Sequence, residues 1–411
     1  MTNASKIDPR KILLWLFSWQ GLAIYALIFG ISILFVKAYF SFLPLYSADG
    51  KLRLSDFYVF WAASQIMQEQ GILAAFDLEL LNAKLRLHFE PRPDLWAIEG
   101  GFGLFWLYPP TIVPFVYPIG YLDAMPALAV FLVISLGLWI YTVKRYYVAP
   151  EGLSILPVLF APTVFVNLAF EQNGIFTAFL LIGFIYAVKD QRNPWVIGLF
   201  AMLMLIKPHF GVLMPIVLLL EKNYKAFGAC AVLCCFYLGL VTYAFGLDYW
   251  IAFLERQEFL SVFINRGEYA RFSTTAFGFF LIAGIPHQIT YVLHAIFVIG
   301  LIGGFLYVWR TQIWELRISM FLLVTFLIPH YSAVYDFTAS AFVFGLIYPF
   351  ALKYKYGKAL MILFWVTPMF FNSAPNLLGY LEMPIVNVMM IVFICYIAKN
   401  NMPPKAAPKA A

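Results

Sequence analysis

Ionisable side chains interrupt several apolar segments of the chain, and these positions are where chemistry is possible. Lys207 and His209 flank Pro208 inside the apolar stretch "AMLMLIKPHFGVLMPIVLLL", and His330 follows Pro329 at the end of another such segment. An ionisable residue at membrane depth costs about 2.5–3.5 kcal/mol on insertion scales and is normally tolerated only against a partner or a water-filled cavity. The pattern predicts a cavity in a broken helix where Lys207 holds an anion.

Asp56 is the candidate for proton transfer. It lies in the stretch "SDFYVFWAASQIMQEQG", which is expected to form an amphipathic helix with Ser55 or Asp56 at its N-terminus and Gly71 at its end. An ionised carboxylate at a membrane surface can act as the general base for a hydroxyl acceptor. A carboxylate in the first turn also stabilises the helix dipole by about 0.3–1 kcal/mol, which is an equally good reason for its presence.

The other candidates also have structural explanations that stay open. Lys207 can extend to the headgroups along its apolar stem, and His330 can satisfy a helix end. Gln172 and Asn173 in "EQNG" can bind sugar hydroxyls or simply form a turn before Gly174. Further polar positions on the same predicted side of the membrane are Tyr108, Tyr331, Asp336, Arg266 and Arg271.

The composition indicates that the elements that must position these groups lie mainly in lipid. Hydrophobic residues make up 63% of the 411 residues, charged residues only 12%, and the mean hydropathy is +0.84, whereas a soluble domain carries about 25% charged residues. Apolar segments without the alternation of a barrel predict an all-α polytopic membrane protein with about 10–12 transmembrane helices. We expect spans near residues 12–36, 123–143, 152–170, 174–189, 194–206, 208–220, 224–246, 288–309, 313–329, 333–350, 357–372 and 382–398.

Lysine and arginine residues fall on alternate connections between the expected spans. The positive-inside rule assigns these connections and both termini to the cytoplasm. The net charge of +6 is then explained by anionic lipid headgroups, and no nucleic-acid partner is required. Two outer loops follow, residues 37–101 and 247–275. In the first loop we expect amphipathic helices along the membrane surface, followed by a proline-broken dip over residues 102–123 that returns to the outer side.

One transmembrane domain is expected over residues 1–398, followed by a disordered basic tail over 399–411. The four cysteines match no zinc or redox spacing. Asp49, Asp56 and Glu171 are oxygen donors on the outer side, but no recognised ligand spacing connects them. No cofactor is required by this pattern, and a divalent metal is possible but unsupported.

Five segments together resemble a known family. They are "SDFYVFWAA", "LYPPTIVPFVYPIGYL", "EQNGIFTAFLLIGF", "NPWVIGLFAMLMLIKPHFGVLMPIVLL" and "IPHYSAVYDF". In this order and spacing they are similar to the membrane glycosyltransferases of family 87, in the GT-C superfamily. The resemblance covers roughly residues 54–350. One departure is Glu-Gln-Asn at residues 171–173, where Gly-Gln-Asn is expected in the family.

The resemblance implies a GT-C-like bundle in a bacterial inner membrane, with an active site on the periplasmic or outer face. It also implies an inverting transfer from a polyprenyl-phosphate sugar, usually of mannose type, to a lipid or glycan acceptor. Asp56 matches the presumed base, Lys207 and His330 match the contacts to the lipid phosphate, and His209 would support them. An apolar groove would hold the isoprenoid tail. The sequence has no Rossmann-type fingerprint for a nucleotide sugar.

Two other functional classes compete with this interpretation. A transporter or lipid flippase also uses broken helices with buried charges, although it predicts inverted repeats that the sequence does not contain. A non-catalytic scaffold could bind a lipid-linked saccharide, and its charged positions would then be separately dispensable.

Overall fold

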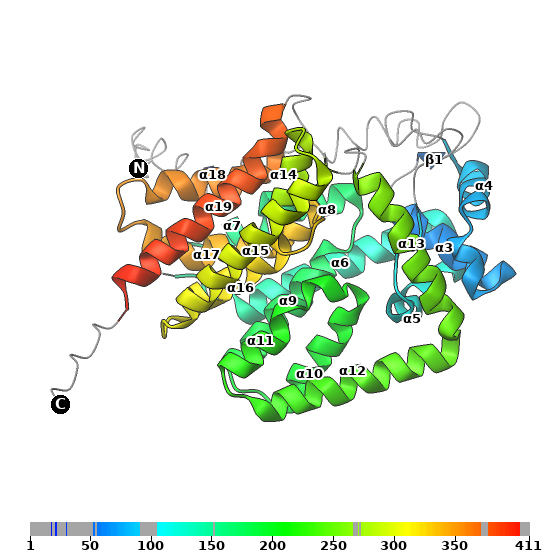
Figure 1. The fold of residues 1–411 in the computed structure, drawn as a ribbon, viewed down its shortest axis with the longest axis horizontal. Helices are drawn as coiled ribbons and strands as arrows, with labels where there is room; N and C mark the ends of the chain where they lie inside the picture. The colour runs from blue at the N-terminus through cyan, green and yellow to red at the C-terminus, as the bar shows by residue number, and fades with distance from the viewer. Residues whose placement is uncertain are drawn as a thin grey trace, which may run out of the picture.

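A computed structural model describes residues 18, 21–22, 30, 52–53, 56–90, 105–150, 153–265, 270, 273–370 and 377–402. Most of the expected first span, most of the tail, Asp49, Arg266 and Arg271 lie outside these residues. The described chain is mainly helical (Figure 1). Its strands are the two-residue β1 (Leu52–Arg53) and β2 (Phe89–Glu90), which pair in parallel. The all-α polytopic fold is confirmed.

Five described segments are long and apolar enough to cross a membrane. They are α6 (Ala124–Tyr146), α12 (Tyr224–Phe245), α15 (His287–Trp309), η7 with α17 (Val334–Ala339 and Ser340–Ala351), and the Met383–Asn400 part of α19 (Leu377–Asn400). The outer faces of α6, α12 and α15 expose large apolar side chains such as Val133, Phe236 and Ile299. In a membrane protein such faces contact lipid, because lipid tails are as apolar as the side chains themselves.

Shorter apolar helices complete the bundle, and most begin or break at a proline. They are α7 (Leu156–Leu159), α8 (Pro162–Phe170), α9 (Gly174–Lys189), α10 (Pro194–Leu203), η4 (Met204–Ile206), η5 (Pro208–Phe210), α11 (Leu213–Leu220), α16 (Trp314–Leu327) and α18 (Gly357–Phe370). Proline lacks a backbone N–H and its ring clashes with the preceding turn. The helical run of α10 and η4 therefore ends at Ile206, before Lys207 and Pro208, as expected. The main core is built around α9 and α16, whose side chains are buried on nearly every face.

A second, smaller core lies where α3 (Phe57–Gln70), η1 (Ile72–Phe76), α4 (Leu78–His88) and α13 (Leu247–Asn265) gather at the right of Figure 1. The first of the helices expected in the outer loop, α3, is not amphipathic, because it is buried on most of its faces. Phe57, Tyr58, Phe60 and Trp61 are all buried, because the proline-broken segment covers this helix. Only α4 is amphipathic as predicted, since it buries Leu81, Asn82 and Leu85 and exposes much of its remaining surface.

The proline-broken segment forms η2 (Pro110–Ile112), α5 (Val113–Val116) and η3 (Tyr117–Tyr121). These turns are too short to span a membrane, as the sequence predicts for a dip. Donors on α3 bond carbonyls that the broken helix leaves unsatisfied. Ser64 Oγ donates to the Tyr117 carbonyl at 2.7 Å, and Trp61 Nε1 donates to the Leu122 carbonyl at 2.9 Å.

The interval 247–275, expected as an outer loop, consists mainly of α13, which is followed by α14 (Ala276–Ile282). The Leu247–Asn265 sequence contains neither proline nor glycine, so no residue in it opposes a continuous helix. Gly246, with φ of 84°, ends α12 and redirects the chain into α13.

Candidate active site

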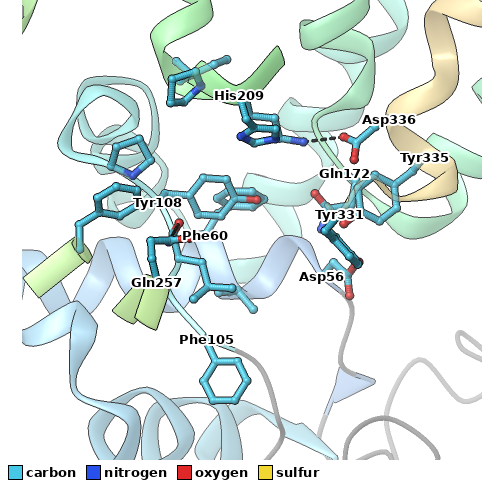
Figure 2. Close-up of a pocket in the computed structure, with 17 residues that line it drawn as sticks. Asp56, Phe60, Phe105, Tyr108, Gln172, His209, Gln257, Tyr331, Tyr335 and Asp336 are labelled. Carbon is cyan, nitrogen blue, oxygen red and sulfur yellow. Dashed lines mark hydrogen bonds and ion pairs between the residues drawn. The ribbon is translucent and has the colours of Figure 1, made fainter. Parts of the chain in front are cut away.

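One cavity of about 260 Å³ collects most of the predicted site residues (Figure 2). It lies between the start of α3, the loop before η2, the α8–α9 turn, the break between α10 and α11, and η7. The predicted residues that line it are Asp56, Tyr108, Gln172, Lys207, His209, Tyr331 and Asp336. Sequence reasoning did not assign other lining residues to the site, among them Phe60, Gln257 and Tyr335.

Lys207 lies at the break between η4 and η5 and carries the cavity's positive charge. Its side chain is buried, and Nζ lies 2.6 Å from Asp336 Oδ1. The alternative in which Lys207 extends to lipid headgroups is therefore wrong, because the ammonium group is paired inside the protein. Asp336 is 3% exposed, and its Oδ2 accepts a hydrogen bond from the Ala333 backbone N–H at 3.0 Å. The turn at the start of η7 thus fixes the partner of Lys207.

Asp56 is half-buried at the N-terminus of α3, but its side chain does not cap that helix. Its Oδ2 instead accepts a hydrogen bond of 3.0 Å from Gln172 Nε2. The helix dipole still acts on the carboxylate. The hydrogen bond shows that the side chain is directed across the cavity, toward the α8–α9 turn.

The α8–α9 turn has an unusual backbone at residue 171, where glycine is expected in the family. Glu171 adopts a left-handed conformation with φ of 55°, which glycine occupies without strain. Gly174 is needed for another reason, because a Cβ there would lie 2.0 Å from the Tyr335 carbonyl oxygen. The turn interpretation of the Asn173–Gly174 pair is consistent with this close packing of α9 on η7.

Tyr108 lines the cavity and lies close enough to both carboxylates to feel their charges. Burial raises the pKa of Tyr108 above its ordinary value, and the charges of Asp336 and Asp56 raise it further. A side-chain hydrogen bond with Asn173 acts in the opposite direction. Tyr108 therefore stays protonated and serves as a hydroxyl group, not as a base. Asn173 itself does not line this cavity but borders the groove behind it.

The two predicted histidines are placed differently. His209 lines the cavity, and its ring packs against Phe210 at a centroid distance of 4.2 Å. His330 is not among the lining residues, and its ring contacts Phe277, Tyr291 and His294 at centroid distances of 4.8–5.2 Å. Partial burial lowers the pKa of His330, so the imidazole is neutral at neutral pH. The structure brings Asp56 and Lys207 together but not His330, whose role in phosphate binding stays a prediction.

A short run of hydroxyl residues, Ser273–Thr275, holds the segment that carries Tyr331. The backbone N–H and the hydroxyl of Thr274 both donate to the Ser332 carbonyl at 2.8 Å, and Thr275 Oγ1 donates to the His330 carbonyl at 2.8 Å. No signal in the sequence identifies these residues, because Ser and Thr runs are common in loops.

An apolar groove of about 500 Å³ adjoins the cavity and shares Phe60 and Ile206 with it. It lies between α5, η3, α6 and α9, and Asn173 is the single polar residue among those that line it. Within the described residues, no group of three or more His, Cys, Asp or Glu side chains is arranged to hold a metal ion.

Comparison with known families places this geometry in context. The sequence profile described as glycosyltransferase family 87 matches residues 106–333, more than half of the chain. The chain belongs to glycosyltransferase family 87. It is therefore a membrane glycosyltransferase, which decides against the transporter and scaffold interpretations. Comparisons with curated proteins and with solved structures found no match. The family-87 match includes Gln172 and Lys207, while Asp56 and Asp336 lie on either side of it.

Proposed function

We propose that this family-87 enzyme transfers a hexosyl group, of mannose type, from a polyprenyl-phosphate donor to a lipid or glycan acceptor. The single observation that carries the proposal is that Asp56 and the Lys207–Asp336 pair line one cavity that adjoins an apolar groove. Transfer from a sugar on a lipid phosphate requires a base for the acceptor hydroxyl, a cation for the phosphate and an apolar groove for the lipid tail.

Of the two carboxylates, Asp56 is the better candidate for the base. The two oxygens of Asp336 are engaged by Lys207 Nζ and by the Ala333 N–H, and the side chain is almost fully buried. Asp56 is only half-buried and lines the same cavity. A general base must reach the proton that it removes, so we assign the role of base to Asp56. Asp336 instead anchors Lys207.

The proposed reaction is a single displacement. Asp56 takes the proton of an acceptor hydroxyl as the acceptor oxygen forms a bond to the anomeric carbon. The bond between that carbon and the phosphate oxygen breaks, and its electron pair stays on the phosphate. Lys207 would stabilise the charge that grows there, and His209 would support it. Because attack and departure occur on opposite faces, the anomeric configuration is inverted.

The apolar groove supports a donor with an isoprenoid tail. A tail in the groove would pass Ile206, which precedes Lys207 in the chain and borders both spaces. A nucleotide sugar has no apolar part to occupy this volume. Tyr108, Tyr331 and Asp336 would surround the sugar at the polar end, and Asn173 would lie at the junction.

The charge pattern supports an active site on the outer face of a bacterial inner membrane. Basic residues stand in the last turns of α6, α9 and α19, at Lys144, Arg145, Lys189 and Lys399. The positive-inside rule places such ends in the cytoplasm. On this orientation both termini are cytoplasmic and the cavity opens toward the periplasm or exterior.

A radiolabelled transfer assay tests the proposal. The purified full chain in nanodiscs is given a membrane lipid extract as acceptor and either polyprenyl-phosphate mannose, polyprenyl-phosphate glucose or GDP-mannose as donor. We expect label to move from a polyprenyl-phosphate sugar and not from GDP-mannose. Transfer from GDP-mannose alone would rule out a polyprenyl-phosphate donor. NMR of the product shows whether the anomeric configuration is inverted.

A further inference from the structure

Gln172 is held between the turn that carries it and the carboxylate of Asp56. Its side chain is 8% exposed, and Nε2 lies 3.0 Å from Asp56 Oδ2. An ionised carboxylate has no proton to donate, so only the NH₂ side of the amide can face it. The amide oxygen of Gln172 has no hydrogen-bond partner within the described part of the chain. The bond from Nε2 to Asp56 is therefore the hydrogen bond that this amide makes within the described residues.

The charges around Asp56 make a donor at this position important. Asp56 interacts electrostatically with Tyr108 and Tyr335, and both of these residues also interact with the Asp336 carboxylate. A second negative charge nearby favours the protonated form of a carboxyl group. Lys207 offsets much of that effect, because it is paired with Asp336. The Gln172 N–H adds to this by stabilising the ionised form of Asp56 through its hydrogen bond.

We propose that Gln172 is a positioning residue for the base, fixing the rotamer of Asp56 and keeping its carboxylate ionised. This inference rests on the proposed function, in which Asp56 accepts the proton of the acceptor hydroxyl. It assigns Gln172 a different role from the sugar contact that the sequence predicts. A sugar contact acts through substrate affinity, whereas a positioning residue acts through the protonation and aim of Asp56.

The test is the pH dependence of kcat/KM for mannose transfer from polyprenyl-phosphate mannose to the lipid extract. The base works only when ionised, so activity falls as the pH drops through its pKa. We call this fall the acidic limb of the pH profile. Gln172→Met removes the N–H at similar side-chain volume and should move the acidic limb to higher pH by about one unit. Gln172→Glu places two carboxylates in contact and should move it further. The KM for the donor should change less than twofold in Gln172→Met.

Gln257→Met is the matched control, because Gln257 lines the same cavity but donates to the Leu107 carbonyl at 3.2 Å. Its acidic limb should stay at the wild-type pH. Thermal unfolding in detergent identifies any variant that has not folded, and Gln172→Glu then provides the second measurement. The inference is overturned if a folded Gln172→Met keeps the wild-type limb, or if Gln172→Met acts only by raising the KM for the donor or the acceptor.

The Asp56→Asn variant separates this inference from the proposed function. If Asp56→Asn is inactive while the Gln172 variants keep the wild-type limb, only the role of Gln172 is wrong. If Asp56→Asn transfers mannose at the wild-type rate, the base assignment fails and the role of Gln172 fails with it.

Discussion

Lys207 shows how a membrane enzyme can hold a charged ammonium group inside an apolar segment. The ammonium group is paired with Asp336, and the second oxygen of Asp336 is held by a backbone N–H. Removing one member of a buried pair leaves an uncompensated charge and costs about 3–5 kcal/mol. The pair therefore links the stability of the α10–α11 break to the chemistry of the cavity.

For Lys207→Met we expect both a lower unfolding temperature in detergent and a higher KM for polyprenyl-phosphate mannose. The double variant Lys207→Met/Asp336→Asn removes both charges and should recover most of the unfolding temperature but not the donor affinity. Thermal unfolding and initial rates over a series of donor concentrations measure the two effects. A single variant with the wild-type unfolding temperature and the wild-type donor KM would contradict the account.

Single residues were predictable from sequence where their type conflicts with their surroundings. Lys207 stands out because lysine is rare inside an apolar run, and Asp56 stands out at a helix start. Their partners were not predictable in this way. Gln172 lies 116 residues from Asp56, and Asp336 lies 129 residues from Lys207. No periodicity connects such positions, so only the packing of α3, α9 and η7 reveals the pairs.

At the scale of elements, the α8–α9 turn fixes how closely α9 approaches η7. Gly174 leaves no room for a side chain, because the Tyr335 carbonyl and Asn167 Nδ2 lie where a Cβ would be. A shift of η7 at this contact would move Asp336 and, through it, Lys207. The glycine therefore has a role in the geometry of the cavity that its conformation alone would not indicate.

Gly174→Ala should destabilise the protein by about 1–3 kcal/mol through overpacking and lower the rate of transfer. Gly228→Ala in α12 is the control, because no atom lies within 4 Å of the position that a Cβ would take there and alanine favours a helix. Unfolding temperature and initial rate are measured for both variants. Equal behaviour of the two would mean that α9 does not need this close approach.

The sequence predicted the broken helices better than it predicted the surroundings of α3. Proline positions locate the breaks directly, since proline cannot continue a helix ladder. The aromatic residues of α3 suit a membrane interface and a buried core equally well. Only the covering segment η2–η3 decides between the two, and that contact is non-local. The helix α13 was missed because its charged residues are typical of a loop between spans.

At the scale of the whole molecule, the orientation in the membrane decides which compartment supplies the acceptor. Helix α4 packs on α3 beside α13 (Figure 1), and the start of α3 lines the polar cavity. The connection between α17 and α18 carries Lys353 and Lys355, and Lys358 follows at the start of α18. This lysine-rich region should lie in the cytoplasm on the proposed orientation.

Cysteine labelling in whole cells tests the orientation. The four native cysteines are first replaced by alanine, and Glu79→Cys in α4 or Lys355→Cys is then introduced at an exposed position. A membrane-impermeant maleimide should label Glu79→Cys in intact cells and Lys355→Cys only after permeabilisation. The reverse pattern would place the cavity on the cytoplasmic side and contradict the proposed activity on the outer face.

The central claim is that Asp56 is the base of a transfer from a lipid phosphate. The most direct measurement is the initial rate of mannose transfer by Asp56→Asn in nanodiscs, compared with Asp77→Asn, whose aspartate caps α4 away from the cavity. We predict that Asp56→Asn folds but loses about 10²–10⁴-fold in rate, whereas Asp77→Asn keeps wild-type transfer. A wild-type rate in Asp56→Asn would contradict the account.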